Sequence, residues 1–261
     1  MCRHRASTRP HDGWAQHYDA VMEESFGVDL HELTSRSLST IRQALSPPAC
    51  VVDYGAGTGR LAIPLARVGF DVTAVDPAPA MLSRIVDKAS ELPIRRTDAT
   101  MASFRSEPRF DLALCVFSVV AHILDHAALA ASCNAVASVL RPGGALLIDV
   151  PHASLFQSFD IETDHLIRCV EVQPVDGVMY RYQERGALRQ ENKTLNYEDI
   201  HILRCWSREE LMQALTSAGF ALVEDYSAQF TRWGADYLWF RLSETGTSSG
   251  VRRAAGMASK E

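Results

Sequence analysis

The stretch that decides the fold is Val51-Val52-Asp53-Tyr54-Gly55-Ala56-Gly57-Thr58-Gly59-Arg60. The apolar run that ends at Tyr54 predicts a short buried strand, because it is partly β-branched and is stopped by glycine. The alternating glycines let the chain turn sharply and admit a ligand against bare main chain. The helix expected from residue 59 offers its unpaired N–H groups to that ligand. A second strand over 71–76 ends in Asp76, whose carboxylate suits the cis-diol of a ribose. Together these features indicate a doubly wound sheet that binds a nucleoside-containing cofactor.

The spacing of the glycines separates two classes of cofactor. The dinucleotide fingerprint G-x-G-x-x-G requires a small residue at its sixth position, where helix and strand pack closely. That position is Arg60 here, and the third glycine, Gly59, stands one place earlier. A nicotinamide-dependent oxidoreductase is therefore disfavoured, and it is kept as an alternative.

The pattern Asp53-x-Gly55-x-Gly57-x-Gly59 resembles motif I of the class I S-adenosylmethionine (SAM) methyltransferases. The resemblance continues in order over residues 49–150, through Asp76-Pro77-x-Pro79-x-Met81-Leu82, Asp98, Phe110-Asp111-Leu112 and Leu140-Arg141-Pro142-Gly143-Gly144. It implies a Rossmann-like enzyme that uses SAM as its cofactor. A non-catalytic SAM-binding module is a second alternative.

The rest of the chain fits an α/β fold. Strands are expected near 49–54, 71–76, 94–97, 110–117 and 144–150, with helices near 59–68, 78–90 and 126–140. This alternation predicts a mostly parallel sheet with helices on both faces. Residues 166–205 break the pattern and predict an antiparallel insertion of about three strands after strand 5. A helix from Ser207 and an antiparallel pair over 220–226 and 237–242 then complete a seven-stranded sheet.

Three regions follow from this pattern. Residues 1–12 and 243–261 are polar and lack periodicity, so both ends are predicted to be flexible. Residues 13–242 are predicted to form one methyltransferase domain, with 166–205 as a substrate cover.

Composition limits the partners of this 261-residue chain. Its net charge is −6 and its pI about 5.9, so neither a nucleic acid nor an anionic membrane is expected. No apolar segment is long enough to span a bilayer, and no signal peptide is apparent. The six cysteines are scattered without zinc-ligand spacing. We expect a reduced, cytoplasmic enzyme with a small-molecule substrate and no metal, and leave a homodimer open.

The resemblance assigns cofactor contacts to individual residues. Asp53 is expected to order the loop and the SAM ammonium, Asp76 to accept both ribose hydroxyls, and Asp98 to bind the adenine amino group. Met81 is expected either to pack on the adenine or to serve the helix core. The full expected set is Asp53, Gly55, Ala56, Gly57, Gly59, Arg60, Asp76, Pro77, Met81, Asp98, Ala99 and Phe117.

The acceptor side is expected after the fourth strand, because ligands sit outside the carboxyl ends of parallel strands. His122 is the only titratable side chain in the apolar run 116–122, and a neutral imidazole there could take a proton from the acceptor or orient it. A structural histidine is the alternative.

A second resemblance rests on Phe117-Ser118-x-x-x-His122 and His17-Tyr18-Asp19. These residues are similar to small-molecule N-methyltransferases that act on nucleotide-linked amino sugars in antibiotic pathways, which also carry an insertion after the fifth strand. The resemblance implies that Tyr18 and His122 lie beside the acceptor amine as catalytic residues; the alternative for Tyr18 is that it only closes over SAM.

The predicted reaction is methyl transfer from SAM to a small molecule, with an amine favoured, in secondary or specialised metabolism. An O-methyltransferase acting on a hydroxyl or a carboxylate is the alternative within the class. The basic residues of the insertion are balanced by six acids, which favours a solvated sheet face over a diphosphate-binding patch: they are Arg168, Arg181, Arg185, Arg189, Lys193 and Arg204.

Overall fold

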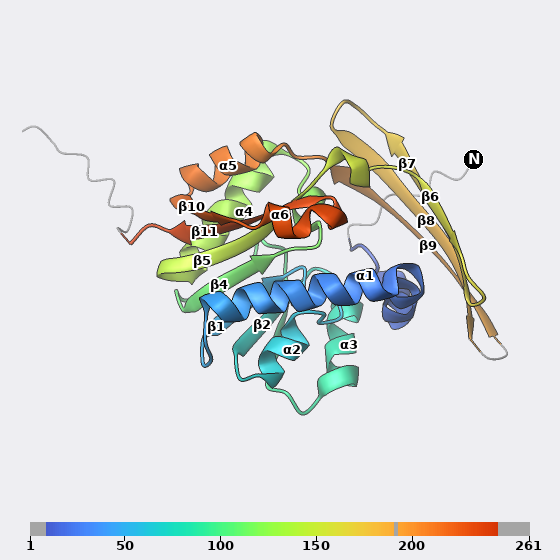
Figure 1. The fold of residues 1–261 in the computed structure, drawn as a ribbon, viewed down its shortest axis with the longest axis horizontal. Coiled ribbons are helices and arrows are strands. Elements are labelled where there is room, and N and C mark those ends of the chain that lie inside the picture. The colour runs from blue at the N-terminus through green and yellow to red at the C-terminus, as the bar shows by residue number, and fades with distance from the viewer. Residues whose placement is uncertain (1–8, 191–192, 245–261) are drawn as a thin grey trace, which may run out of the picture.

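The computed structural model describes residues 9–190 and 193–244, which form two separate sheets (Figure 1). The larger sheet has seven strands in the order β10-β11-β5-β4-β1-β2-β3. Their bounds are Cys50–Tyr54 (β1), Asp71–Asp76 (β2), Arg95–Asp98 (β3), Phe110–Cys115 (β4), Leu140–Pro151 (β5), Phe220–Asp225 (β10) and Ala235–Leu242 (β11). Only β11 runs antiparallel to its neighbours β5 and β10. The predicted doubly wound, mostly parallel sheet is confirmed.

Helices cover both faces of this sheet. One face is covered by α1 (Ala15–Ala44), α2 (Ala62–Arg67), α3 (Pro79–Ala89) and the short α6 (Ser227–Phe230), and the other by α4 (His126–Val139) and α5 (Arg208–Ser217). Serine at position 207 caps α5 with Glu210 in a capping box, as the sequence indicates. None of the helices in the described part of the chain has the length and apolarity needed to cross a membrane.

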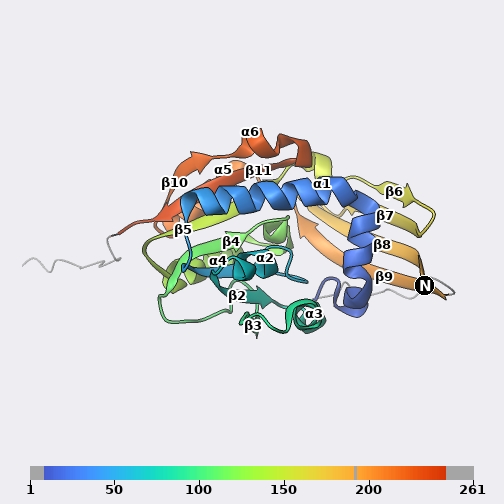
Figure 2. The same cartoon turned by 60° about the horizontal axis from the view of Figure 1, so that its bottom comes forward.

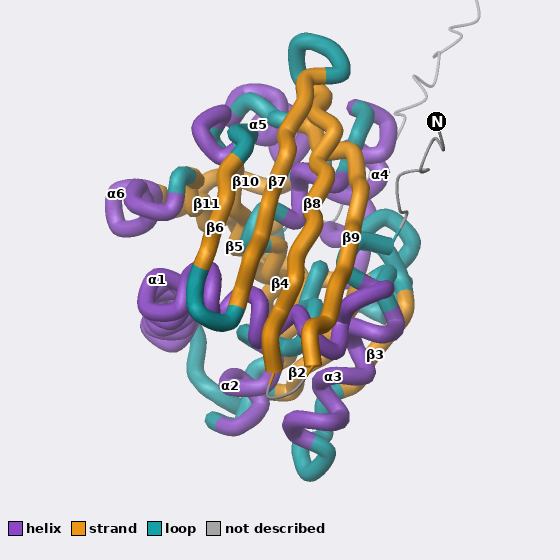
Figure 3. The backbone as a smooth tube through the Cα atoms, turned by 90° about the vertical axis from the view of Figure 1, so that its right-hand side faces the viewer, coloured by secondary structure: helices purple, strands orange, loops and turns teal. Residues whose placement is uncertain are grey.

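The insertion forms the second sheet, seen face-on in Figure 3. It has four strands rather than about three: β6 (Phe159–Glu162), β7 (Leu166–Pro174), β8 (Met179–Gln190) and β9 (Lys193–Arg204). All pair antiparallel in chain order. The additional strand β6 is only four residues long, and a run of that length carries too little alternation to be recognised.

Helix α1 is 30 residues long and changes direction at Gly27. Gly27 has φ +24° and ψ −102°, a non-helical conformation that glycine tolerates. Figure 2 shows the two parts of α1, one along the large sheet and one along β7–β9. Trp14 and Val21 form a small core with Leu166, Leu188 and Tyr197 of the insertion. The N-terminal segment therefore attaches the second sheet to the first.

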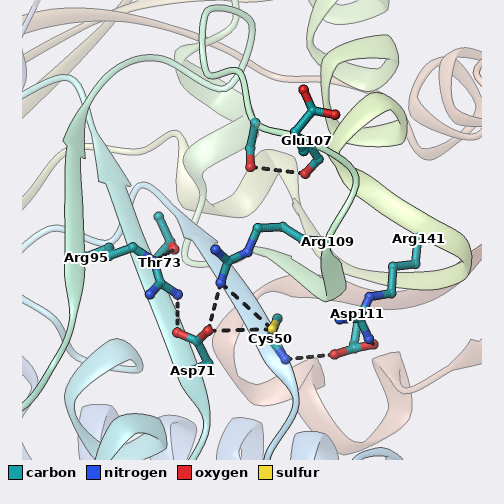
Figure 4. A network of polar contacts seen from close by, with 9 residues as sticks. Cys50, Asp71, Thr73, Arg95, Glu107, Arg109, Asp111 and Arg141 are labelled. Carbon is teal, nitrogen blue, oxygen red and sulfur yellow. Dashed lines mark hydrogen bonds and ion pairs between the residues drawn. The ribbon is translucent and has the colours of Figure 1, made fainter.

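The amino ends of the parallel strands are tied together by polar contacts (Figure 4). Asp71 on β2 pairs with both Arg95 and Arg109. Asp111 on β4 accepts hydrogen bonds from the backbone N–H of Cys50 (2.7 Å) and from Arg141 (2.7 Å). This network fixes the strands relative to one another at the edge opposite the glycine loop.

One predicted boundary is wrong. The strand expected near 144–150 begins at Leu140, directly after α4 ends at Val139, so Leu140-Arg141-Pro142-Gly143-Gly144 belongs to β5. Most of the two predicted tails, residues 1–8 and 245–261, lies outside the described part of the chain. Residues 9–12 are described, and they contact the site presented next. The predicted boundary at residue 12 stays a prediction.

Candidate active site

The glycine loop connects β1 to α2 at the carboxyl edge of the sheet. A Cβ at Gly55 would lie 2.3 Å from Val119, and one at Gly59 would lie 2.9 Å from Ile63. These two glycines, both with positive φ, are therefore required by packing within the protein. At Gly57 the nearest atom would be the Met81 methyl at 3.4 Å. Gly57 is thus the position in the loop that leaves room for a ligand to approach the main chain.

Asp76 connects the end of β2 to this loop. Its Oδ2 accepts the N–H of Gly57 (2.8 Å) and its Oδ1 accepts the N–H of Ala78 (2.8 Å). Burial raises the pKa of Asp76, while these two N–H groups oppose the rise. Each carboxylate oxygen can accept a second hydrogen bond, so two acceptor positions remain. They suit the two hydroxyls of a ribose, as the sequence predicts.

Asp53 and Asp149 are two further buried acids at the same edge. Burial raises the pKa of Asp53 to about 7, with the Arg60 guanidinium opposing it. Burial raises the pKa of Asp149 to about 6, opposed by the N–H groups of Ser118 and Phe117 and by Arg60. Arg60 lies over the Phe117 ring at 4.8 Å and donates to the Thr34 hydroxyl. Raised carboxyl pKa values in a cluster mark a candidate ligand site.

Asp149 also holds a strained turn after β4. Phe117 and Ser118 have φ of 74° and 63°, a region that non-glycine residues rarely adopt. The Asp149 carboxylate accepts the N–H of Phe117 at 2.8 Å and that of Ser118 at 2.9 and 3.1 Å. The turn leads directly to Val119, which packs on Gly55. Strain of this kind concentrates at functional sites.

The remaining predicted cofactor residues line the same edge with different exposure. Asp98 ends β3 beside Asp76, is half-exposed, and lies 3.9 Å from Arg9. Ala99 donates its N–H to the Asp76 carbonyl. Met81 is buried against Ala15, Ala78 and Tyr18, so the structure gives it a core role on at least one side. Ala56 is buried, and Pro77 is half-buried at the start of the turn into α3.

The two predicted catalytic residues are joined by a row of aromatic rings. His122 ends a short 3-10 helix (Val119–His122), and its side chain is exposed. Its ring centroid is 5.5 Å from that of His201; His201 is 5.3 Å from His11, and His11 is 5.2 Å from Tyr18. The structure therefore brings Tyr18 and His122 to the same region through two intervening histidines.

The surrounding protein keeps these groups uncharged. Removal of its ring from water lowers the pKa of His122, although part of the side chain is exposed; His201 adds to the effect and Asp199 opposes it. The same effect lowers the pKa of His11 to about 3. Burial raises the pKa of Tyr18 to about 12. At neutral pH, His122 is an acceptor of hydrogen bonds and a weak base, and Tyr18 retains its proton.

Sequence reasoning missed Asp199, His201 and His11. Asp199 accepts the backbone N–H of His11 (2.6 Å) and the indole N–H of Trp14 (3.2 Å). Asp199 and His201 are two residues apart on β9, so they share one face of the sheet. In the sequence Asp199-Ile200-His201-Ile202, polar and apolar residues alternate. This alternation could have identified Asp199 and His201 as neighbours on one face of a strand. Nothing in the local sequence distinguishes His11.

Asp19 was also missed as a contact of the glycine loop. It accepts a hydrogen bond from the Thr58 hydroxyl and pairs with Lys88 of α3 (2.7 Å). Asp12 accepts the N–H of Ala80 at the start of α3 (2.8 Å). These contacts place the N-terminal segment over the loop and explain why Tyr18 lies beside Met81.

The insertion's arginines are engaged by acids and polar groups. Arg168 is 4% exposed and forms a buried pair with Glu184 at 2.9 Å. Arg185 pairs with Glu171 and Glu198, and Arg204 with Glu210. This distribution gives no support for a diphosphate-binding patch. Within residues 9–190 and 193–244, no group of three or more His, Cys, Asp or Glu side chains is arranged to hold a metal ion.

The chain matches known methyltransferases in sequence and fold. The family model for the methyltransferase domain matches residues 28–225. A protein of Geobacillus sp. (strain WCH70) named as a methyltransferase is 25% identical over 235 residues, covering 85% of this chain and 92% of its own. A ubiquinone biosynthesis O-methyltransferase of Methylocella silvestris is 38% identical over 96 residues, only 36% of each chain.

Solved structures share the fold at low identity. A SAM-dependent methyltransferase from Clostridium acetobutylicum has a TM-score of 0.77 at 17% identity, covering 87% of this chain and 98% of its own. A sugar N-methyltransferase from Streptoalloteichus has a TM-score of 0.70 at 20% identity, covering 94% and 97%. The glycine loop, its partner Asp76 and the family match lead to one conclusion: this chain belongs to the methyltransferase-domain family and is a class I SAM-dependent methyltransferase.

Proposed function

We propose that this enzyme transfers the methyl group of SAM to an amine of a small molecule, in a specialised biosynthetic pathway. The observation that carries the choice of an amine is the neighbourhood of His122: the His201 ring lies 5.5 Å from it between centroids, and the Asp199 carboxylate lies beside His201. The acceptor side therefore combines a weakened base with a carboxylate.

A weak base disfavours a hydroxyl acceptor. A hydroxyl requires a group that removes its proton during methyl transfer. Since the pKa of His122 is lowered, its imidazole is a weaker base than a histidine in water. A neutral amine is nucleophilic without a base. The low basicity of His122 therefore supports an amine, and modifies the general-base role predicted from the sequence.

The negative charge of Asp199 disfavours a carboxylate acceptor. Burial alone would raise the pKa of Asp199, but its contacts with His201 and with the N–H of His11 lower it below the usual range. The group is therefore ionised at neutral pH and repels another anion. An amine gains positive charge as it is methylated, so a nearby carboxylate stabilises the product side of the reaction.

The residues of the chain then have separate tasks. Bound SAM supplies an electrophilic methyl group on a sulfonium. Asp76, Gly57 and Asp53 would hold the cofactor at the sheet edge, and Asp149 fixes the turn that carries Phe117 at the same edge. His122 accepts an N–H bond from the acceptor, so that the nitrogen lone pair is directed at the methyl carbon. As the N–C bond forms, the C–S bond breaks, and the electron pair remains on sulfur.

The names of similar proteins leave two acceptor classes. One solved structure of this fold is named a sugar N-methyltransferase and another an amino pentose methyltransferase, whereas the partly matching Methylocella relative is an O-methyltransferase. The arrangement around His122 supports the former class. An O-methyltransferase stays the alternative.

A set of matched acceptors tests the proposal. Amino sugars would be offered with SAM beside analogues that carry a hydroxyl or a carboxylate in place of the amine, and products identified by mass spectrometry. We expect methylation of the amine series alone. Methylation confined to the hydroxyl or carboxylate analogues would overturn it.

A further inference from the structure

Two imidazoles on the acceptor side lie close to one carboxylate. His11 Nδ1 lies 3.5 Å from Asp199 Oδ2, and His201 Nδ1 lies 3.7 Å from Asp199 Oδ1. Both Nδ1 atoms are buried, and neither has a hydrogen-bond partner within the described residues. His201 is 3% exposed and Asp199 8%. The contacts that His11 and His201 can make therefore depend on which nitrogen of each neutral ring carries the proton.

The carboxylate determines that distribution. A neutral imidazole carries one N–H and one lone pair, and an ionised carboxylate only accepts hydrogen bonds. The proton of each ring is favoured on the nitrogen nearer to Asp199, which is Nδ1. The Nε2 atoms of His11 and His201 are then left as lone-pair acceptors. Together with His122, they supply three imidazole acceptors in one region.

The negative charge of Asp199 favours a ligand whose N–H group is positively charged or becomes so during the reaction. The hydrogen bonds that Asp199 accepts come from neutral groups: the backbone N–H groups of His11 and Ile200 and the indole N–H of Trp14. The nearby Arg168 is engaged by Glu184 in a buried pair. Asp199 therefore gives the three imidazoles a negative surrounding potential.

We propose that Asp199 orients His11 and His201 so that their Nε2 atoms form a subsite for the N–H groups of the acceptor amine. The proposal rests on the proposed function and names the residues that recognise the amine. His11 and His201 contact the acceptor, and Asp199 is a positioning residue that acts through them. Hydroxyl groups elsewhere on the acceptor can use the same lone pairs, but an anionic group is repelled.

The side chains packed around this subsite come from four elements. They are Tyr18 and Trp14 of the N-terminal segment, Arg168 of β7, Tyr182 and Glu184 of β8, and Tyr197 of β9. Tyr182 stacks on His201 at 4.9 Å and fixes its ring plane.

Nitrogen NMR of the full chain tests the tautomers directly. Protein labelled with ¹⁵N-histidine and saturated with S-adenosylhomocysteine (SAH) would be recorded near neutral pH, with signals assigned by His11→Gln, His201→Gln and His122→Ala. We expect protonated Nδ1 and unprotonated Nε2 in both His11 and His201. This reading needs no variant of Asp199, so it stands even if such a variant folds poorly. Protonated Nε2 in either ring would overturn the proposal.

Small probes then test the ligand class. Propylammonium chloride, sodium propionate and propanol would be titrated separately into the same sample. We expect propylammonium to shift the signals of His11, His201 and His122, and propionate to leave them unchanged. Equal shifts with propionate, or with sodium chloride, would contradict a subsite for amines.

Asp199→Asn and Trp14→Phe separate orientation from structure. Asn keeps an oxygen for the Trp14 and His11 N–H groups but removes the charge, so we expect mixed tautomers and at least a several-fold weaker response to propylammonium. Trp14→Phe removes one bond to Asp199 and keeps its charge, so the tautomers should be unchanged. If both variants behave alike, Asp199 is only structural. These NMR measurements do not depend on catalytic turnover. If amines are not methylated but the NMR result is as expected, the proposed function is wrong and the proposed subsite still stands.

Discussion

At the scale of single residues, Asp76 carries the clearest link between structure and cofactor. It holds Gly57 and Ala78 through their N–H groups and retains two acceptor positions. Asp76→Ala should weaken SAM binding by about 1.5–3 kcal/mol, the scale for losing hydrogen bonds to a charged group. Calorimetric titration checks this. The matched control is Asp71→Ala at the other end of β2, and equal affinity in the two variants would contradict the assignment.

Asp53 and Asp149 should make cofactor affinity depend on pH. Burial raises the pKa of Asp53 to about 7 and of Asp149 to about 6, from an ordinary value of 3.8. The two protonated acids therefore contribute fully to the free energy of unfolding when the pH is below their ordinary pKa of 3.8. This contribution is lost as the pH rises through their raised pKa values. A sulfonium nearby favours the ionised carboxylates, so SAM binding should release protons and strengthen with pH.

SAH lacks the sulfonium charge and serves as the control ligand. We expect the ratio of SAM to SAH affinity to rise several-fold between about pH 5.5 and 8. Calorimetry in two buffers with different ionisation heats measures both affinity and proton release. A ratio that is constant or falls with pH would show that the two acids do not face the sulfonium.

His122 should affect turnover more than cofactor binding. If it orients the acceptor, His122→Ala should lower turnover on the order of 10²-fold, the scale for misplacing a reactant. SAM affinity should change little, because Asp76 and the glycine loop are intact. His126→Ala, an exposed histidine at the start of α4, is the control. Unaltered turnover at every pH would show that His122 is structural.

The positions of the motif-bearing residues were predictable because they follow from local sequence. Asp53 and Asp76 lie near the carboxyl ends of the paired strands β1 and β2, and Gly57 lies in the loop after β1, so their common edge follows from the topology. Asp199 and His11 are 188 residues apart and meet only after the insertion folds against the N-terminal segment. No spacing within the sequence reports that contact.

At the scale of elements, the network at the amino ends of the strands should determine stability without affecting the site. Asp111→Ala removes the acceptor of the Cys50 N–H and the partner of Arg141. We expect a loss of about 1–3 kcal/mol in the free energy of unfolding, the cost of an unsatisfied polar group. Denaturant unfolding measures it, and SAM affinity should be unchanged.

Asp111→Asn is the graded control, since the amide keeps one oxygen for Cys50. Its loss should be smaller than that of Asp111→Ala. A large effect of either variant on SAM affinity would mean that the two edges of the sheet are coupled.

Strands and helices of the large sheet were predictable because burial and turn residues mark their ends. The strand β5 was harder, because Pro142-Gly143-Gly144 normally signals a break, yet the pairing with β4 begins at Leu140. The kink of α1 at Gly27 was also missed. A single glycine within a helical pattern does not reveal which of two sheets each half will cover.

At the scale of the whole molecule, the N-terminal segment connects the cofactor edge with the insertion. Asp19 contacts the glycine loop through Thr58, while Trp14 stacks on Tyr197 of the second sheet at 4.3 Å. The site is therefore assembled from the large sheet, the N-terminal segment and β9. The sequence identified the first of these in detail and the others only in outline.

We propose that the glycine loop and Asp76 bind SAM rather than a dinucleotide, and titration calorimetry of the full chain tests that claim most directly. SAM, SAH and NADH would be titrated separately under identical conditions. The account predicts saturable binding of SAM and SAH at one site per chain and no binding of NADH. Saturable binding of NADH, with none of SAM, would contradict it.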